Sequence, residues 1–267
     1  MTKDPQSRGP CLGHSGLVIP SDFVICHSSF SVPVFTLATT EMNTTPKIRA
    51  LTFDVGGTLM RPWRSVGHVY AEVAARNGLK GLSPEDLNKK FAAAWCEKKN
   101  FQHTKEGWAR LVDQTFAGLC EPPPSRAFFP AIYQRFAEAD TWRIYDDVLP
   151  ALDALASKDV PLAVISNWDE RLRPLLRQLR LDGYFETIVV SCEVGFAKPS
   201  PVIFEHAAKM LRVPPEQILH VGDSAKEDFG GAESAGLQAL LLDRDNTAVD
   251  VARISSLRQI EVYLCPH

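Results

Sequence analysis

Short apolar runs recur along the chain after residue 48 and constrain its fold more than any other feature. They are RALTFDV (49–55), PLAVIS (161–166), TIVVSCEV (187–194), ILHVGDS (218–224) and ALLLDR (239–244). Strands that are apolar along nearly their whole length are typical of a parallel sheet covered on both faces. Segments with helical periodicity lie around and between the later runs, at 147–158, 170–181 and 201–212. This alternation predicts a doubly wound α/β core.

The stretch between the first two runs, residues 64–143, has a different pattern. It shows helical periodicity and almost no strand signal, and its periodic segments are 66–78, 83–95, 107–119 and 125–139. We therefore expect a bundle of about four helices, inserted after the first strand. The α/β core would then comprise residues 46–63 and 144–267.

The first 45 residues are rich in Ser, Thr, Pro and Gly, and their apolar stretches are short and interrupted. They lack the continuous apolar segment of a secretory signal. We expect the folded protein to begin near Met42, and the preceding residues to be a disordered tail or an upstream extension of the reading frame.

Bulk properties exclude several classes of partner. The 267 residues carry a net charge of −3, so no basic excess argues for nucleic acid or an anionic membrane. No apolar run approaches the roughly 18–20 residues of a membrane span. The six cysteines are scattered without a CxxC pair, which favours reduced thiols and a cytoplasmic location.

Polar residues follow the apolar runs at four places. These are DVGGT (Asp54 to Thr58), ISN (Ser166 and Asn167), AKPSP (Lys198) and GDSAKED (Asp223 and Asp228). In a parallel sheet all four would meet at one edge. Carboxylates, an ammonium group, a hydroxyl and glycine turns are what metal-assisted phosphoryl transfer requires. Each stretch alone is commonly a helix cap or a turn, so the signal lies in their combination.

With these motifs, the chain resembles the haloacid dehalogenase-like hydrolase superfamily. The family pattern is an Asp-x-Asp-x-Thr loop, a Ser or Thr at the second strand, a Lys and GDxxxxD, and the match covers about residues 47–245. The helical insertion resembles the helical cap of that family. Within it, DVGGT, AVISNWD and HVGDS are similar to the branch that contains haloacid dehalogenase-like hydrolase domain-containing protein 3 and the insect rhythmically expressed gene 2 protein.

The resemblance implies a role for each matching residue. Asp54 would be the nucleophile, and Lys198 would pair with it and with the transferring phosphoryl group. Thr58, Ser166 and Asn167 would orient the loop and hold the phosphoryl oxygens. The implied substrate is a small phosphorylated metabolite.

The resemblance also implies a Mg²⁺ site. Its ligands would be Asp54, the backbone carbonyl of Gly56, and Asp223, with Asp228 as a further ligand or as support. Ser224 would help to hold water on the metal.

The sequence departs from the family pattern at Gly56. In phosphatases of this superfamily the residue two positions after the nucleophile is an acid, which protonates the leaving oxygen and later deprotonates the attacking water. Such general acid–base help is typically worth about 10² to 10⁴ in rate. Its loss would cost roughly 3 to 5 kcal/mol of transition-state stabilisation. The implied metal site is unaffected, because that ligand is a main-chain carbonyl.

Three functions are compatible with this departure. The first is a slow or specialised phosphatase for good leaving groups such as acyl or anhydride phosphates, with His68 as the nearest substitute base. The second is a catalytically silent fold that binds a phosphorylated ligand or a protein. The third is a metal-free 2-haloacid dehalogenase, against which Asp223 and Asp228 argue. We favour the first. A histidine placed as His68 is more commonly an ordinary residue of a helix surface or core than a catalytic base.

The substrate would be chosen by the cap helices, whose sequence offers no motif. Four tryptophans could line a pocket there, although core packing explains them as well: Trp63, Trp95, Trp108 and Trp142.

Overall fold

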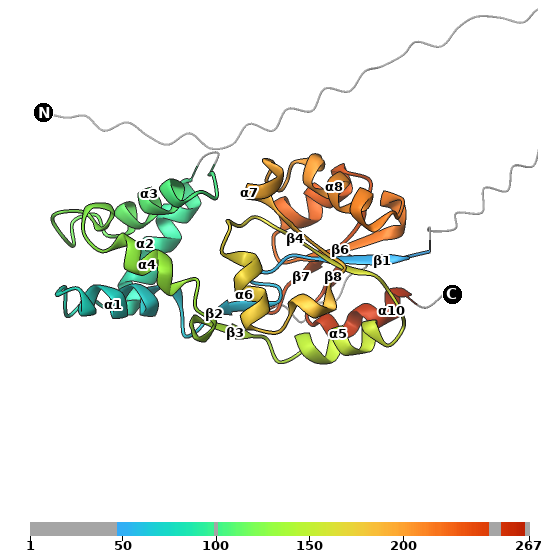
Figure 1. Ribbon diagram of the computed structural model, residues 1–267, viewed down its shortest axis with the longest axis horizontal. Helices are drawn as coiled ribbons and strands as arrows, with labels where there is room; N and C mark the ends of the chain where they lie inside the picture. Colours follow the sequence, from blue (N-terminus) through green and yellow to red (C-terminus); the bar gives the residue numbers. More distant parts are fainter. Residues whose placement is uncertain (1–46, 99–100, 246–251, 265–267) are drawn as a thin grey trace, which may run out of the picture. The chain divides into compact units, whose positions relative to one another are not determined.

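A computed structural model of the chain describes residues 47–98, 101–245 and 252–264. The predicted N-terminal extension, residues 1–45, lies outside these described residues. The core is a parallel sheet with the strand order β5-β4-β1-β6-β7-β8 (Figure 1). Its strands are β1 (Ala50–Phe53), β4 (Leu162–Ser166), β5 (Thr187–Val190), β6 (Ile218–Gly222), β7 (Gln238–Leu242) and β8 (Arg253–Ile254).

Helices cover both faces of the sheet, and this confirms the doubly wound α/β prediction. In Figure 1, α8 lies above the sheet and α5 below it. The core helices are α5 (Val148–Ala156), α6 (Leu172–Gln178), α7 (Ser191–Val194), α8 (Pro201–Leu211), α9 (Gly231–Ser234) and α10 (Glu261–Leu264), and a π-helical segment, η5 (Ala225–Gly230), precedes α9. Short 3-10 turns are η3 (Asp182–Tyr184), η4 (Pro215–Gln217) and η6 (Leu257–Ile260).

Strand side chains alternate between the two faces, as the pleat of a strand requires. Leu51 and Phe53 pack into the apolar cluster between the sheet and helices α5 and α6, whereas Ala50 packs into the cluster between the sheet and α8. All three are fully buried. Every face of β1 is thus occupied by core, so functional groups on this strand can lie only at its ends.

The strand order reverses at β1. From β1 the chain passes to β4 and β5 on one side and later returns to β6, β7 and β8 on the other. The carboxyl ends of β1, β4 and β6 therefore lie next to one another, at the place where ligands bind in open α/β sheets.

The sequence predicted one strand for residues 187–194, but only the first half of this run is a strand. Strand β5 ends at Val190, and α7 (Ser191–Val194) follows. The neighbouring strand β4 ends at the same level, because its last residue, Ser166, pairs with Val190. Beyond Val190 the chain therefore has no strand beside it with which to pair. The hydroxyl of Ser191 instead bonds the main chain of Trp168, at 3.1 Å to both its N–H and its carbonyl. Strand β8 was not predicted, because two residues show no apolar run.

Residues 66–135 contain four helices of the inserted segment. They are α1 (Val66–Arg76), α2 (Pro84–Glu97), α3 (Lys105–Thr115) and α4 (Phe129–Arg135), with the 3-10 turns η1 (Pro124–Arg126) and η2 (Ala139–Thr141). The side chains of Ser65, Ser83 and Thr104 cap the first three helices by accepting backbone N–H bonds. The helices enclose an aromatic-rich core of their own. We refer to this segment as the cap.

The two connections between core and cap pair with each other. Strands β2 (Met60–Pro62) and β3 (Trp142–Ile144) form an antiparallel ribbon, in which Met60 lies opposite Ile144. The sequence predicted neither strand, since each has only three residues.

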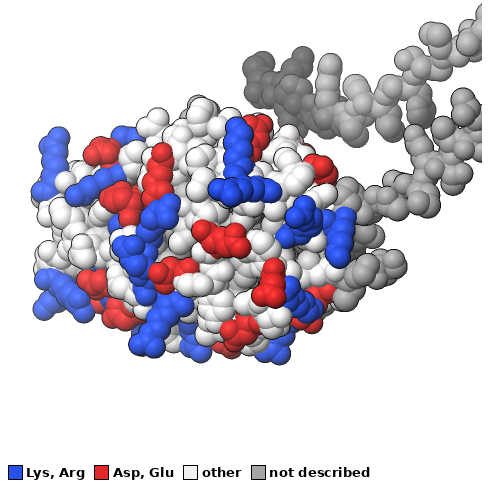
Figure 2. Space-filling view, turned by 45° about the vertical axis from the view of Figure 1, so that its right-hand side comes forward, with Lys and Arg blue, Asp and Glu red and all other residues white. Residues whose placement is uncertain are grey.

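The described surface carries charges of both signs. Lysine and arginine side chains alternate with acidic ones on the face drawn in Figure 2. Within 47–98, 101–245 and 252–264 we find no helix with the length and hydrophobicity that crossing a bilayer requires. The cysteines of these ranges, Cys96, Cys120 and Cys192, are free thiols.

A polar cluster around Asp147 ties distant segments together. The Asp147 carboxylate accepts two bonds from Arg244 (2.9 and 3.0 Å), one from the Ser256 hydroxyl (2.9 Å) and one from the Leu257 N–H (2.8 Å). Arg244 also donates to the Thr58 carbonyl at 2.7 Å. Burial would raise the pKa of Asp147, but these hydrogen bonds outweigh it and lower that pKa.

We expect Asp147→Asn to lower the free energy of unfolding by about 1–2 kcal/mol at neutral pH, because it removes charge-assisted hydrogen bonds. The folded-state pKa is below the unfolded one, so this contribution is present above about pH 4 and is lost as the pH falls further. Urea unfolding at several pH values measures it. Asp146→Asn, in the same turn but exposed, is the matched control. An equal effect of both variants at pH 7 would contradict the cluster's role.

Candidate active site

Asp54 lies directly after β1 and is buried, with only 7% of its surface exposed. Its N–H donates to the Val221 carbonyl on β6 at 3.0 Å, which extends the sheet bonding by one residue. One carboxylate oxygen, Oδ1, accepts from Lys198 Nζ at 2.6 Å and from the Ser166 hydroxyl at 3.2 Å. Burial raises the pKa of Asp54 to about 7, against the opposing effect of Lys198. A second cation at this site would restore the ionised form.

Lys198 is held between two carboxylates. Its Nζ is 2.6 Å from Asp54 and 2.5 Å from Asp228. Burial would lower the pKa of the ammonium group, but Asp228 and Asp54 together raise it, so the group is charged. Asn167 fixes the main chain of this loop, since it accepts from Lys198 N–H at 2.7 Å and donates to the Lys198 carbonyl at 3.0 Å.

Asp228 accepts more side-chain hydrogen bonds than Asp54 or Asp223 does. Besides Lys198, it accepts from Ser224 N–H at 2.9 Å and faces His220 Nε2 at 3.2 Å. Burial lowers the pKa of His220, so the ring is neutral. Its Nδ1 lies 2.9 Å from the Thr52 hydroxyl. We assign the proton to Nε2, because the carboxylate needs a donor and the hydroxyl can donate to Nδ1.

Two glycines make room for the acidic side chains. A Cβ on Gly222 would overlap the carboxylate of Asp228, and one on Gly57 would overlap that of Asp223. Gly57 also has a φ of +87°, a conformation that side chains disfavour. Thr58 also helps to position the Asp223 carboxylate, because its hydroxyl donates to that carboxylate at 3.2 Å.

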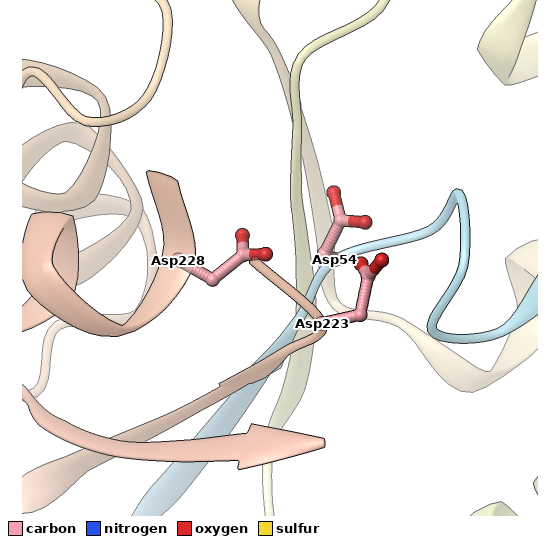
Figure 3. A group of neighbouring side chains, drawn as sticks. All are labelled: Asp54, Asp223 and Asp228. Carbon is pink, nitrogen blue, oxygen red and sulfur yellow. The ribbon is translucent and has the colours of Figure 1, made fainter. Parts of the chain in front are cut away.

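Asp54, Asp223 and Asp228 point toward one another from the ends of β1 and β6 and from η5 (Figure 3). Each offers a carboxylate oxygen within 4.8 Å of the others. Mutual repulsion and burial raise the pKa of Asp223 as well as that of Asp54. Clustered hard oxygen donors with a single ammonium group among them fit a divalent cation such as Mg²⁺.

A cavity of about 340 Å³ opens from Asp54 into the cap. The residues that line its end next to Asp54 are Gly56, Ser166, Asn167, Lys198, Asp223, Ser224, Glu227 and Asp228. The ring of Trp168 lies over Gly56, since a Cβ added there would be 3.2 Å from Trp168 Cζ3. The space in which a side chain at position 56 would begin is therefore bordered by an indole ring.

The remaining predicted residues fall into two groups. Ser166 and Asn167 line the cavity, as do Trp95, Trp108 and Trp142. Three others are placed elsewhere: Thr58 is fully buried behind Asp223, Trp63 is 44% exposed, and His68 bonds Ser65 at the start of α1, at 2.7 Å. Phosphate contacts by Thr58, Ser166, Asn167 and Lys198 stay predictions.

Sequence reasoning missed the residues that surround the motifs. Trp168 directly follows the Ser-Asn motif, and its apolar bulk within a polar loop was a usable signal. His220 within the apolar run of β6 was another, because a buried histidine needs partners for both ring nitrogens.

The sequence profile of the haloacid dehalogenase-like hydrolases matches residues 48–236, and the chain belongs to this family. It is 32% identical over 206 residues to haloacid dehalogenase-like hydrolase domain-containing protein 3 of Xenopus laevis, which covers 73% of this chain and 84% of that protein. It is 28% identical over 228 residues to rhythmically expressed gene 2 protein of Drosophila melanogaster, at 78% and 87% coverage. These relatives confirm the predicted branch.

Solved structures share the fold. The putative hydrolase YfnB of Bacillus subtilis, bound to magnesium, aligns with a TM-score of 0.66 at 20% identity, covering 82% of this chain and 99% of that one. A 2-haloacid dehalogenase of Pseudomonas syringae aligns with a TM-score of 0.59 at 25% identity, covering 81% and 98%. A HAD phosphatase of Thermococcus onnurineus aligns with a TM-score of 0.60 at 21% identity, covering 81% and 98%. Since a phosphatase and a dehalogenase align with similar TM-scores, the fold alone does not define the reaction.

We expect Gly222→Ala to lower the free energy of unfolding by about 1–3 kcal/mol, because the added methyl group has to displace the buried Asp228 carboxylate. Gly183→Ala is the matched control, since its added Cβ has no atom within 4 Å. Urea denaturation of both variants measures the difference. Equal stability of the two variants would show that Asp228 is not confined as described.

Proposed function

We propose that the chain is a Mg²⁺-dependent hydrolase that acts on a small phosphorylated substrate through an aspartyl-phosphate on Asp54. One observation carries the proposal: Asp54, Asp223 and Asp228 cluster at the end of a cavity that can hold a ligand, and Lys198 pairs with Asp54 and Asp228. The magnesium in the Bacillus subtilis structure supports the choice of cation. The scattered thiols further suggest a cytoplasmic protein.

The residues that would hold Mg²⁺ are Asp54, Asp223 and the Gly56 carbonyl. Asp228 would support them, because both of its oxygens already accept protein hydrogen bonds. When bound, the cation would neutralise carboxylate and phosphoryl charge.

In the first step Asp54 Oδ attacks phosphorus, the bond from phosphorus to the leaving oxygen breaks, and that oxygen leaves with the bonding electrons. Lys198 offsets the charge that builds on the phosphoryl oxygens. The Ser166 hydroxyl, 3.2 Å from Asp54, would turn to donate to one of them. Water then attacks phosphorus, the bond from phosphorus to Asp54 Oδ breaks with its electrons returning to the carboxylate, and the proton of the water leaves on the released phosphate.

Position 56 limits the substrates that such a site can use. Gly56 has no side chain to protonate a leaving oxygen, and His68 does not line the cavity. The favoured substrates are those whose leaving oxygen needs no proton, such as acyl phosphates.

We expect purified protein with Mg²⁺ to hydrolyse acetyl phosphate, and Asp54→Asn or excess EDTA to reduce the rate to the level of the blank. Phosphate release measures this. Asp146→Asn is the control, since Asp146 is an exposed aspartate outside the cavity.

If Asp54→Asn matches wild type, the enzyme proposal fails for simple phosphates. If nothing is hydrolysed but beryllofluoride binds with a need for both Mg²⁺ and Asp54, the chain is a binding protein with an intact nucleophile. Chloride release from a 2-haloacid in EDTA would instead identify a dehalogenase.

An acid restored at position 56 should broaden the substrate range. We expect the double variant Gly56→Asp/Trp168→Ala to hydrolyse an alkyl phosphate at least about tenfold faster than Trp168→Ala, because general acid help returns. Gly56→Asp alone should gain less, since its Cβ would press on Trp168. Steady-state kcat/KM for glycerol 3-phosphate tests this. No gain in the double variant would show that proton transfer at position 56 does not limit the rate.

A further inference from the structure

The cavity beyond the catalytic residues is lined largely by aromatic side chains. In the cap, Tyr70, Phe91, Trp95, Trp108, Phe129 and Phe136 border it. Trp95 and Trp108 are stacked, with ring centroids 5.9 Å apart and planes at 13°. Aromatic rings favour other rings at such contacts, by about 0.5–1.5 kcal/mol beyond area burial.

Among the described residues that line this part of the cavity, none offers a free positive charge. The ammonium group of Lys98, which is not part of the lining, lies over the Trp95 ring and 3.9 Å from the Glu227 carboxylate. Arg171 lines it, but its guanidinium already bonds both oxygens of Asp169, at 2.6 and 2.8 Å, and stacks on Tyr133. His103 is 8% exposed, and burial lowers its pKa to about 4, so it is neutral at pH 7. A second anionic group on the ligand would therefore be buried without a partner, which is costly.

The leaving-group end of the cavity carries an indole ring next to Gly56. Trp168 contacts the place where a side chain at position 56 would start, and it packs on Trp142 at a centroid distance of 5.1 Å. Both tryptophans line the cavity. A leaving group at this end therefore meets an aromatic surface instead of a proton donor.

We propose that the site is specific for aryl phosphates: a single phosphoryl group at Asp54, carried by an uncharged aromatic leaving group that packs against Trp168 and the aromatic side chains of the cap. This inference rests on the proposed function and deepens it.

The chemistry agrees with the missing acid. Asp54 Oδ forms the bond to phosphorus while the aryl O–P bond breaks, and the aryl oxygen leaves as a phenolate with both electrons. Phenols have a pKa near 10, as the tyrosine side chain does. The phenolate is thus a stable enough leaving group to depart unprotonated and to take its proton from water afterwards. An alkoxide is far more basic and would need the acid that position 56 lacks.

The size of the cavity is consistent with this ligand. A volume of about 340 Å³ lies at the lower end of the range for small-molecule pockets, which is roughly 300–1,000 Å³. One aromatic ring and a phosphoryl group fit this scale better than a large ligand does.

The test compares three substrates of similar size on wild-type protein with Mg²⁺. We expect kcat/KM for phenyl phosphate to exceed that for cyclohexyl phosphate by about a hundredfold or more, because only the latter needs a general acid. We expect 4-carboxyphenyl phosphate to be at least about tenfold poorer than phenyl phosphate, although its leaving group is better, because its carboxylate would be buried unpaired. Equal values for phenyl and cyclohexyl phosphate, or a preference for the carboxylated ring, would overturn the inference.

A variant provides a second, independent measurement. Trp108→Ala should lower kcat/KM for phenyl phosphate about tenfold through lost ring contacts. It should leave acetyl phosphate within about twofold, because acetyl phosphate has no ring to pack there. Trp63→Ala, at an exposed tryptophan outside the cavity, is the control and should change neither rate. Equal losses on both substrates would argue against a ring-binding role for the cap.

Hydrolysis of acetyl phosphate also distinguishes a failure of the aryl specificity from a failure of the proposed hydrolase function. If it is hydrolysed with a need for Asp54 while aryl phosphates have no advantage, only the aryl specificity fails. If neither acetyl nor phenyl phosphate shows hydrolysis that depends on Asp54, the proposed function fails, and the specificity fails with it.

Discussion

The rest of the site depends on the ion pairs that the buried ammonium group of Lys198 makes with Asp54 and Asp228. Three carboxylates lie within 4.8 Å of one another, and Lys198 bonds two of them directly. Without it, burial and mutual repulsion would favour protonated carboxyls, which are poor nucleophiles and poor metal ligands. The surrounding structure holds this one group in place: Asn167 clamps its main chain, and Gly222 leaves room for Asp228. The charge of one ammonium group cannot neutralise three carboxylates, so the excess negative charge of the site would favour a bound divalent cation.

The fold and the convergence of the motifs could be predicted because they depend on local patterns. A run of apolar residues indicates a buried strand, and parallel strands bring their carboxyl ends to one edge; Asp54, Ser166 and Asp223 therefore had to lie close together. The switch from strand to helix at Ser191 depended on where a neighbouring strand ends, which the local sequence does not state. The catalytic roles stay predictions, since the structure places these residues without testing what they do.

The contact between Trp168 and Gly56 was beyond sequence reasoning for a different reason. The residues lie far apart in the sequence, and their contact depends on the rotamer of a ring that also packs on Trp142. Read from the sequence, Gly56 is only a missing acid. In the structure, the adjacent space belongs to an aromatic surface that continues into the cap. The absence of an acid at position 56 and the aromatic surface beside it therefore belong to one local arrangement.

The cluster around Asp147 has a consequence for how the molecule responds to a ligand. Thr58, in the loop of Asp54, is connected by hydrogen bonds through Arg244 and Asp147 to Ser256 and Leu257 near the end of the described chain. A ligand that stabilised the loop of Asp54 would, by thermodynamic linkage, also favour the bonded state of this distant segment. Amide hydrogen exchange at 254–260 should report occupancy of the active site, although no residue there lines the cavity.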